Sequence, residues 1–195
     1  MFKRIAYILL ILLQVPFFSV NACSCPKQAI KSYDQLIPYF QQINNIAEEI
    51  RRFLEPQENP QSKTIIFDID DTLITTNVYL RSSEGLAPIP SMVDLFRWIQ
   101  QKGFIVIIVT ARKVATRKST LELLNKAGYN ISESMVFFVE NMCCKEQQRI
   151  NLAANHNIIA TIGDNELDIS GQAAGRGFKL PEKPFSGMLS LCRLP

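Results

Sequence analysis

The chain has 195 residues, 47% of them hydrophobic, which is enough for one well-buried domain but not for two full-sized ones. Its formal charge at pH 7 is +3, from 21 Lys and Arg against 18 Asp and Glu, too small an excess to indicate a nucleic-acid partner. A single histidine and the lack of Cys–His clusters in the sequence argue against a structural zinc site and against a histidine phosphatase.

The first 22 residues have the pattern of a secretory signal. Two cations, Lys3 and Arg4, precede an apolar run at residues 5–20, and small residues follow it. The run is short for a transmembrane helix and contains Pro16. We therefore exclude residues 1–22 from the fold and expect an exported protein that is periplasmic, anchored in the outer membrane as a lipoprotein, or secreted.

Two processing routes are open at Cys23. The residues before it, Val20-Asn21-Ala22, fit a plain cleavage site, and together with Cys23 they also resemble a bacterial lipobox. In the second route Cys23 would carry a lipid and anchor the mature chain to a membrane. An unmodified Cys23 would be an ordinary thiol or a disulfide partner, because an exported protein can keep disulfides. The other cysteines are Cys25, Cys143, Cys144 and Cys192.

Residues 23–62 are predicted to form an N-terminal helical arm and a linker. Within residues 31–55, apolar side chains recur at steps of three and four, the period of an amphipathic helix. We expect this stripe to pack onto the core, and it comprises Leu36, Phe40, Ile43, Ala47, Ile50 and Leu54. Residues 56–62 are rich in Pro, Asn and Gln and are predicted to be the linker.

Residues 63–195 alternate between strand and helix patterns. Short apolar runs predict strands at 64–69, 104–109, 135–139 and 158–162. Helices are predicted at 91–101, 116–127 and 145–154, with a short one after Asp164, and residues 74–90 are predicted to be a loop or small flap. This alternation indicates right-handed βαβ units. The expected fold class is therefore α/β, a three-layer, Rossmann-like sandwich around a central parallel sheet.

Three carboxylates, Asp68, Asp70 and Asp71, directly follow the first predicted strand. The carboxyl ends of parallel strands are where open α/β sheets place their ligands. In extended backbone Asp68 and Asp70 would point the same way, and two like charges that close require a cation or a proton. The pattern predicts phosphoryl transfer onto an aspartate beside a divalent metal, although an Asp-rich turn that caps a helix has the same composition.

Two further strand ends offer groups that suit a phosphoryl substrate. Thr110, Ala111 and Arg112 follow the second strand, where a hydroxyl and backbone N–H groups can hold phosphate oxygens. Lys145 follows the third strand, and its compact charge can neutralise a phosphoryl group. The ordinary alternatives are a helix cap at Thr110 and a solvated lysine at the start of a helix.

The fourth strand is followed by Asp164 and Asp168. Because they are four residues apart, one helical turn would place both on a single face. Carboxylates so placed suit Mg²⁺, which binds carboxylates together with water and phosphate. The alternative is helix capping by Asp164, with a second acid favoured in the first turn.

Taken in chain order, these motifs resemble those of the haloacid dehalogenase (HAD) superfamily of phosphohydrolases, over residues 64–181. The chain is similar to the acid-phosphatase branch that includes bacterial lipoprotein acid phosphatases and plant vegetative storage proteins. The segments that carry this likeness are Phe67-Asp68-Ile69-Asp70-Asp71-Thr72-Leu73, Lys145-Glu146-Gln147-Gln148-Arg149, Ile162-Gly163-Asp164 and Gly177-Phe178-Lys179-Leu180-Pro181. The chain departs from the branch at Glu166, where an aromatic residue is frequent, and at residues 182–185, where Asn-Pro-Met-Tyr is common; substrate preference is what these departures affect.

The resemblance implies a HAD fold with a minimal cap and a Mg²⁺-dependent acid phosphatase acting on small phosphomonoesters. Asp68 would be the nucleophile that forms an aspartyl-phosphate, and Asp70 the general acid and base. Mg²⁺ would be held by the Asp68 carboxylate, the Asp70 carbonyl and Asp164, with Asp168 close by or acting through water. Thr110 and the amides of Ala111 and Arg112 would bind the transferred phosphoryl group, and Lys145 would balance its charge.

The substrate and the activity each have alternatives. A 5′-nucleotidase would need an aromatic side chain to stack on the base; Tyr79, Phe185 and Trp98 are candidates, although the helical spacing of Trp98 better fits a core residue. A receiver domain that accepts phosphate on aspartate also carries acids, a Thr and a Lys at strand ends. A non-catalytic storage or binding protein on the same scaffold is the third reading. The export signal argues against a receiver domain, and the Asp68–Asp70 pair favours turnover over both.

Overall fold

The computed structural model describes residues 37–76 and 86–183. Several sequence predictions fall outside these ranges, namely the signal at 1–22, Cys23, Cys25, Leu36, Tyr79, Phe185 and Cys192. Within the described ranges, Cys143 and Cys144 are free thiols. Among the same residues, no helix is both long enough and apolar enough to cross a membrane.

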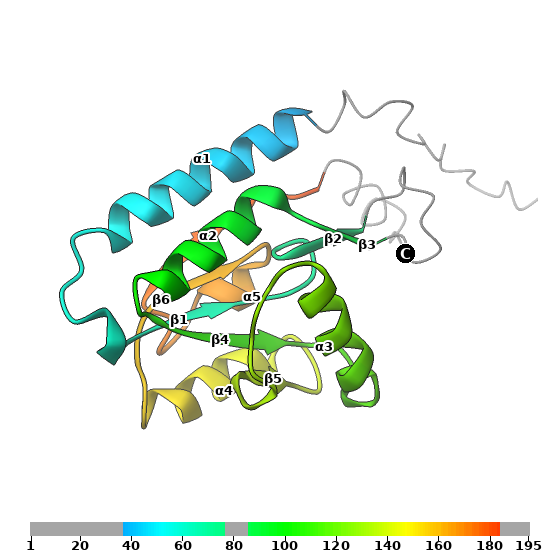
Figure 1. Cartoon of the computed structure of the whole chain (residues 1–195). Helices are drawn as coiled ribbons and strands as arrows, with labels where there is room; N and C mark the ends of the chain where they lie inside the picture. Colours follow the sequence, from blue (N-terminus) through cyan, green and yellow to red (C-terminus); the bar gives the residue numbers. More distant parts are fainter. Residues whose placement is uncertain (1–36, 77–85, 184–195) are drawn as a thin grey trace, which may run out of the picture.

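A parallel sheet of five strands lies at the centre of the described chain (Figure 1). The strand order is β5-β4-β1-β6-β7, with bounds β1 (Lys63–Phe67), β4 (Ile105–Thr110), β5 (Val136–Phe138), β6 (Asn157–Gly163) and β7 (Arg176–Lys179). The central strand β1 pairs with β4 and β6, and its last residue, Phe67, is in register with Ile108 and Ile162. The predicted parallel sheet is thus confirmed, but the strand prediction missed β7, whose sequence Arg-Gly-Phe-Lys has no apolar run.

Helices cover both faces of this sheet, which confirms the three layers (Figure 1). Their bounds are α1 (Ile37–Leu54), α2 (Pro90–Gln101), α3 (Arg117–Lys126), α4 (Cys144–Ala153) and α5 (Glu166–Ile169), with single 3₁₀ turns at Pro60–Ser62, Val114–Thr116 and Glu133–Met135. Alternate residues of β1 serve the two faces, as the period of a strand requires. Ile65 and Phe67 pack in the core that includes α1 and α2, and Ile66 packs in a smaller core with Leu152 of α4.

The N-terminal helix α1 belongs to the main core. Its buried side chains are Tyr39, Ile43, Ala47, Ile50 and Leu54; the last four belong to the predicted apolar stripe, whose Phe40 is partly buried against the same core. Full burial of a side chain of the size of Leu or Ile stabilises a fold by about 1.5–3 kcal/mol. Helix α1 therefore contributes to the stability of the domain that carries the sheet.

A two-stranded antiparallel ribbon lies beside the sheet, at the segment predicted to be a loop or small flap. It consists of β2 (Ile74–Thr76) and β3 (Leu86–Pro88), with Ile74 opposite Pro88. The backbone N–H of Ile89 donates to the carbonyl of Leu73 at 3.0 Å, which ties the base of the ribbon to the turn after β1.

Candidate active site

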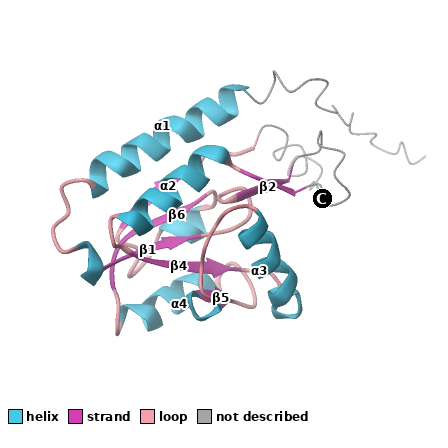
Figure 2. Cartoon of the chain, viewed as in Figure 1, coloured by secondary structure: helices cyan, strands magenta, loops and turns pink. Residues whose placement is uncertain are grey.

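The loops that follow β1, β4 and β6 meet at one edge of the sheet, because parallel strands end on the same side (Figure 2). A cavity of about 220 Å³ lies there. Its lining residues come from all of these loops and from the start of α4, and they are Asp68, Asp70, Asp71, Ala111, Met142, Lys145, Asp164 and Asn165. The structure therefore brings together most of the residues that the sequence predicted for the site.

Three carboxylates converge at this cavity. Asp68, Asp164 and Asp168 each offer one oxygen, and these oxygens lie within 4.8 Å of one another. Asp68 and Asp168 are buried, with 6% and 2% of their surface exposed. Within the described ranges this group consists of carboxylates alone, and carboxylate oxygens suit a hard cation such as Mg²⁺. The donor set fits the predicted metal.

Lys145 lies between two of these carboxylates. Its Nζ donates to Asp68 Oδ1 and to Asp168 Oδ1, both at 2.5 Å, and the side chain is buried. Burial alone would lower the pKa of Lys145, but the two carboxylates raise it above its usual value, so the ammonium stays charged. The alternative of a solvated lysine at a helix start is wrong for Lys145.

With all three carboxylates ionised, the cluster would hold more negative charge than Lys145 can neutralise, because three carboxylates and one ammonium sum to −2 (−3 + 1). Burial raises the pKa of Asp68 to about 7, although Lys145 opposes the rise. Burial, with the nearby Asp168 and Asp71 carboxylates, raises the pKa of Asp164 to about 6. A divalent cation among these oxygens would stabilise the ionised forms and balance the excess charge.

Asp168 is held by the backbone turn in which it lies. Its Oδ2 accepts the N–H of Asn165 at 3.1 Å, while Asn165 Oδ1 accepts the N–H of Leu167, so that the two side chains form a capping box for α5. Asp164 precedes this cap. The expectation that Asp164 and Asp168 share one face of a helix is therefore wrong, and the turn brings them together instead.

Gly163 allows Asp168 to approach the end of β6. A Cβ at position 163 would lie 2.3 Å from the Cβ of Asp168, closer than two such atoms can come. The Gly163-Asp164 sequence thus has a steric role as well as a chemical one.

Arg149 is a structural partner of the site that the sequence analysis did not single out. It is 1% exposed and donates from Nη1 to the carbonyls of Leu167 at 3.1 Å and Asp168 at 2.7 Å, and from Nη2 to the carbonyl of Ser170. These bonds fix the backbone that carries Asp168. Its spacing of four residues from Lys145 on α4, which places both on one helical face, is the signal that points to it.

Asp70 has a different environment from Asp68. Its carboxylate is 56% exposed and forms a two-point ion pair with Arg112, at 2.7 Å from Nη2 to Oδ1 and 2.9 Å from Nε to Oδ2. The strand ends at Phe67, and Asp71 has a φ of 52° in the turn that follows. Asp68 and Asp70 both line the cavity, although the Asp68 carboxylate binds Lys145 and the Asp70 carboxylate binds Arg112.

The loop after β4 that was predicted to bind phosphate is stabilised by a hydrogen bond between two of its own residues. Thr110 is buried, and its Oγ1 accepts the N–H of Arg112 at 3.2 Å, so its hydroxyl stabilises the turn. Ala111 lines the cavity, whereas the Arg112 guanidinium binds Asp70 and contacts Thr120 Oγ1 at 3.4 Å.

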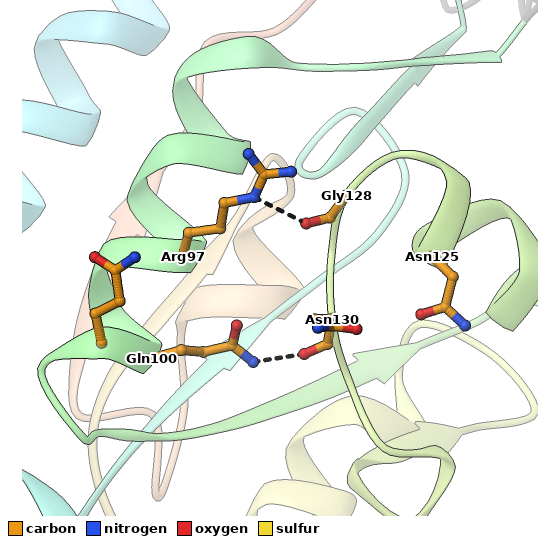
Figure 3. A pocket seen from close by; sticks show the side chains of 6 residues that line it. Arg97, Gln100, Asn125, Gly128 and Asn130 are labelled. Atoms are coloured by element: carbon orange, nitrogen blue, oxygen red, sulfur yellow. Dashed lines mark hydrogen bonds between the residues drawn. The ribbon is translucent and has the colours of Figure 1, made fainter.

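A larger hollow of about 540 Å³ lies elsewhere, between α2 and the loop after α3 (Figure 3). Two hydrogen bonds join residues of its lining: Arg97 Nε donates to the Gly128 carbonyl at 3.2 Å and Gln100 Nε2 to the Asn130 carbonyl at 2.6 Å. These bonds brace α2 against the loop, and the hollow contains none of the acidic residues of the site.

The sequence profile of the family described as "HAD superfamily, subfamily IIIB (Acid phosphatase)" matches residues 18–186. The chain belongs to this family. Curated relatives of this HAD member include an uncharacterized protein of Arabidopsis thaliana, 25% identical over 138 residues, and vegetative storage protein 1 of the same plant, 26% identical over 141 residues. The alignments cover 67% and 60% of the chain, but only 47% and 52% of those relatives. The chain thus spans about half the length of the curated relatives it matches.

Solved structures support the HAD fold. The class C acid phosphatase of Bacillus anthracis superposes with a TM-score of 0.61 at 15% identity, covering 82% of this chain and 84% of that one. The same kind of enzyme from that organism with tungstate bound gives 0.59 at 13% identity, covering 85% and 93%. At these identities the likeness establishes the α/β HAD architecture.

We expect Arg149→Met to unfold at a lower denaturant concentration. The substitution keeps the length of the side chain but leaves three backbone carbonyls around Asp168 without their donor, at a cost of about 1–3 kcal/mol per unsatisfied group. Urea unfolding followed by circular dichroism measures the loss. The matched control is Arg52→Met on the exposed side of α1, which should change the free energy of unfolding by less than about 0.5 kcal/mol. Equal midpoints for the two variants would contradict the role given to Arg149.

Proposed function

We propose that the chain is an exported, Mg²⁺-dependent acid phosphatase that hydrolyses small phosphomonoesters through an aspartyl-phosphate on Asp68. The observation that carries this proposal is the cluster of Asp68, Lys145 and Asp164 that lines one cavity, with the buried Asp168 bonded to Lys145. Membership of the acid-phosphatase subfamily supports the reaction class.

In the first step an Asp68 carboxylate oxygen attacks phosphorus, and the bond between phosphorus and the ester oxygen breaks. The leaving alkoxide takes a proton from the Asp70 carboxyl, so a neutral alcohol departs and the phosphoryl group stays on Asp68. Lys145 is bonded to Asp68 Oδ1 and holds the carboxylate in one orientation throughout.

In the second step Asp70, now ionised, takes a proton from a water molecule that attacks the phosphorus of the aspartyl-phosphate. The bond between phosphorus and Asp68 breaks, and inorganic phosphate leaves with both carboxyl groups restored to their starting states. Asp70 suits both proton transfers because it lines the cavity and also reaches solvent.

The carboxylates of Asp68 and Asp164, with the Asp70 carbonyl, would hold Mg²⁺, and Asp168 would orient Lys145 and lie close to the ion or act through water. A bound Mg²⁺ supplies positive charge that offsets the repulsion between the phosphoryl oxygens and the attacking carboxylate. Ala111 and the backbone of the Thr110–Arg112 turn would bind the remaining phosphoryl oxygens.

Two finer points of the function stay proposals as well. Export rests on the pattern of residues 1–22, with plain cleavage or acylation at Cys23 as the two routes. A 5′-nucleotidase would need an aromatic side chain at the site, but Trp98 contacts Arg51 and Lys102 by cation–π geometry and does not line the cavity. Mass spectrometry of the mature N-terminus distinguishes the two routes.

The similarity to a plant protein called a vegetative storage protein favours one alternative, a non-catalytic protein on the same scaffold. An assay with p-nitrophenyl phosphate and Mg²⁺ at mildly acid pH separates the two. Turnover that saturates with substrate supports the phosphatase, and tight binding of phosphate without turnover supports the alternative.

We expect Asp68→Asn to abolish turnover of p-nitrophenyl phosphate, because the amide cannot form the aspartyl-phosphate. Release of p-nitrophenol, measured by absorbance, should fall to the level of buffer alone. Asp94→Asn, which changes an exposed aspartate on α2, is the matched control and should retain full activity. Activity of Asp68→Asn comparable to wild type would exclude Asp68 as the nucleophile.

We expect Mg²⁺ to raise the melting temperature of the mature protein, since a ligand bound only to the folded state stabilises it by about 2.7 kcal/mol at a hundred times its dissociation constant. For a domain of this size the shift is about 5–10 °C in differential scanning calorimetry. Excess EDTA should reverse the shift and stop turnover. Asp164→Asn should lose most of the shift, and a shift of wild-type size in that variant would remove Asp164 from the metal site.

We expect Arg112→Ala to lower kcat/KM in a way that depends on the leaving group, because Arg112 positions the acid Asp70. Alkyl phosphates need protonation of the leaving oxygen, so their kcat/KM should fall by about ten- to a thousandfold. p-Nitrophenyl phosphate, which releases a stable phenolate, should lose much less. An equal loss for both esters would indicate that Arg112 acts on the phosphoryl group itself.

A further inference from the structure

A second hollow, of about 490 Å³, adjoins the proposed catalytic cavity through Asp70, which lines both. It is bounded by the turn after β4 and by α3, with Leu86 of β3 at its edge. The inner cavity, at about 220 Å³, is smaller than the roughly 300–1,000 Å³ of sites that enclose a whole small-molecule ligand. It is suited to the phosphoryl group, and the rest of an ester must extend beyond it.

The proposed chemistry fixes the direction of that extension. The atom that receives a proton from Asp70 is the ester oxygen, so the alcohol portion of the substrate begins at Asp70. The second hollow is the space that opens next to this carboxylate. An alcohol portion that extends from Asp70 into the second hollow would meet the side chains that line it.

The side chains that line the second hollow carry a net positive charge in addition to the ion pair of Arg112 and Asp70. When Asp70 is ionised, Arg112 and Asp70 neutralise each other, which leaves Lys113 and Lys126 against Glu122, a balance of +1 (2 − 1); when Asp70 carries the proton it donates, Arg112 adds to a balance of +2 (3 − 1). Within the described part of the chain, the side chains of the two lysines form no ion pair with a carboxylate. Both ammonium groups are exposed and available to an anion.

The same lining offers little to an aromatic ring. Its remaining side chains among the described residues are aliphatic or carry hydroxyls, and none is aromatic. Among the described residues, the hollow thus has no ring on which a nucleobase could stack.

Resting on the proposed phosphatase function, we propose that the second hollow binds the alcohol portion of the substrate and selects alcohols that carry an anionic group of their own. The substrate class is a small hydrophilic phosphomonoester with a second anionic group, a carboxylate or a phosphate, which Lys113 and Lys126 contact while Asp70 faces the ester oxygen. The carboxylate of Glu122 in the same lining repels this second anionic group.

The test compares kcat/KM for matched esters at low ionic strength. 2-Phosphoglycolate is set against 2-hydroxyethyl phosphate to probe a carboxylate, and propane-1,3-diol bisphosphate against 3-hydroxypropyl phosphate to probe a second phosphate. We expect the wild-type protein to prefer the anionic member of at least one pair by roughly three- to tenfold, the effect of one or two charges at the distances of such a hollow. The preference should shrink in high salt.

Variants that remove one charge from the lining test whether its positive charge causes the preference for anionic esters. Lys113→Gln and Lys126→Gln should each lower the ratio of anionic to neutral kcat/KM, while Glu122→Gln should raise it. The control is Lys118→Gln, an exposed lysine of α3 that does not line the hollow and should leave the ratio unchanged. A ratio of one or less in the wild type for both pairs, or ratios that do not respond to Lys113 and Lys126, overturns the inference. Hydrolysis of p-nitrophenyl phosphate by the wild type shows that such a failure concerns the hollow and not the phosphatase function.

Discussion

The arrangement of the site depends on one buried ammonium group. Lys145 is bonded to Asp68 and Asp168 at 2.5 Å, and none of the three side chains has enough exposure to be solvated by water instead. A buried charge is tolerated when it is paired and its partners are held in place. Most of the local structure serves this requirement: α4 presents Lys145, the turn after β1 presents Asp68, and the capped turn of α5 presents Asp168.

The strand order explains why these partners can meet. With β1 between β4 and β6, the loops after the three strands adjoin without any long connection. Among the three carboxylates of the cluster, Asp168 is the one that does not follow a strand directly, and several contacts support it. Arg149 binds the carbonyls on either side of it, Asn165 completes the capping box, and Gly163 leaves room for its side chain. The precision of the cluster thus comes from backbone contacts behind the carboxylates.

The features that local pattern controls could be predicted from the sequence. Apolar periodicity predicted α1 and the sheet, and the acids after β1 and β6 predicted the cluster, because strand ends in a parallel sheet converge whatever the side chains do. What could not be predicted depends on contacts distant in sequence. The ion pair between Asp70 and Arg112 joins residues 42 positions apart, and the burial of Lys145 depends on Asp68, 77 positions away. Strand β7 forms because β6 offers it an edge, which its own four residues do not indicate.

The two aspartates of the Asp68-x-Asp70 motif differ in environment in the way that their proposed roles demand. A nucleophile that must approach phosphorus benefits from a buried, oriented carboxylate, whereas a group that gives and takes protons must exchange them with solvent. Lys145 provides the first condition for Asp68, and the exposed pair with Arg112 provides the second for Asp70. When every one of these side chains is ionised, the sign of the charge changes across the same few residues, from −2 in the inner cluster (−3 + 1) to +1 in the outer hollow (2 − 1). This change of charge would suit an ester whose phosphoryl group binds together with a cation in the inner cluster and whose alcohol carries an anionic group into the outer hollow. Both parts of such an ester would meet opposite charge only when the phosphoryl group lies at Asp68, which is the productive orientation.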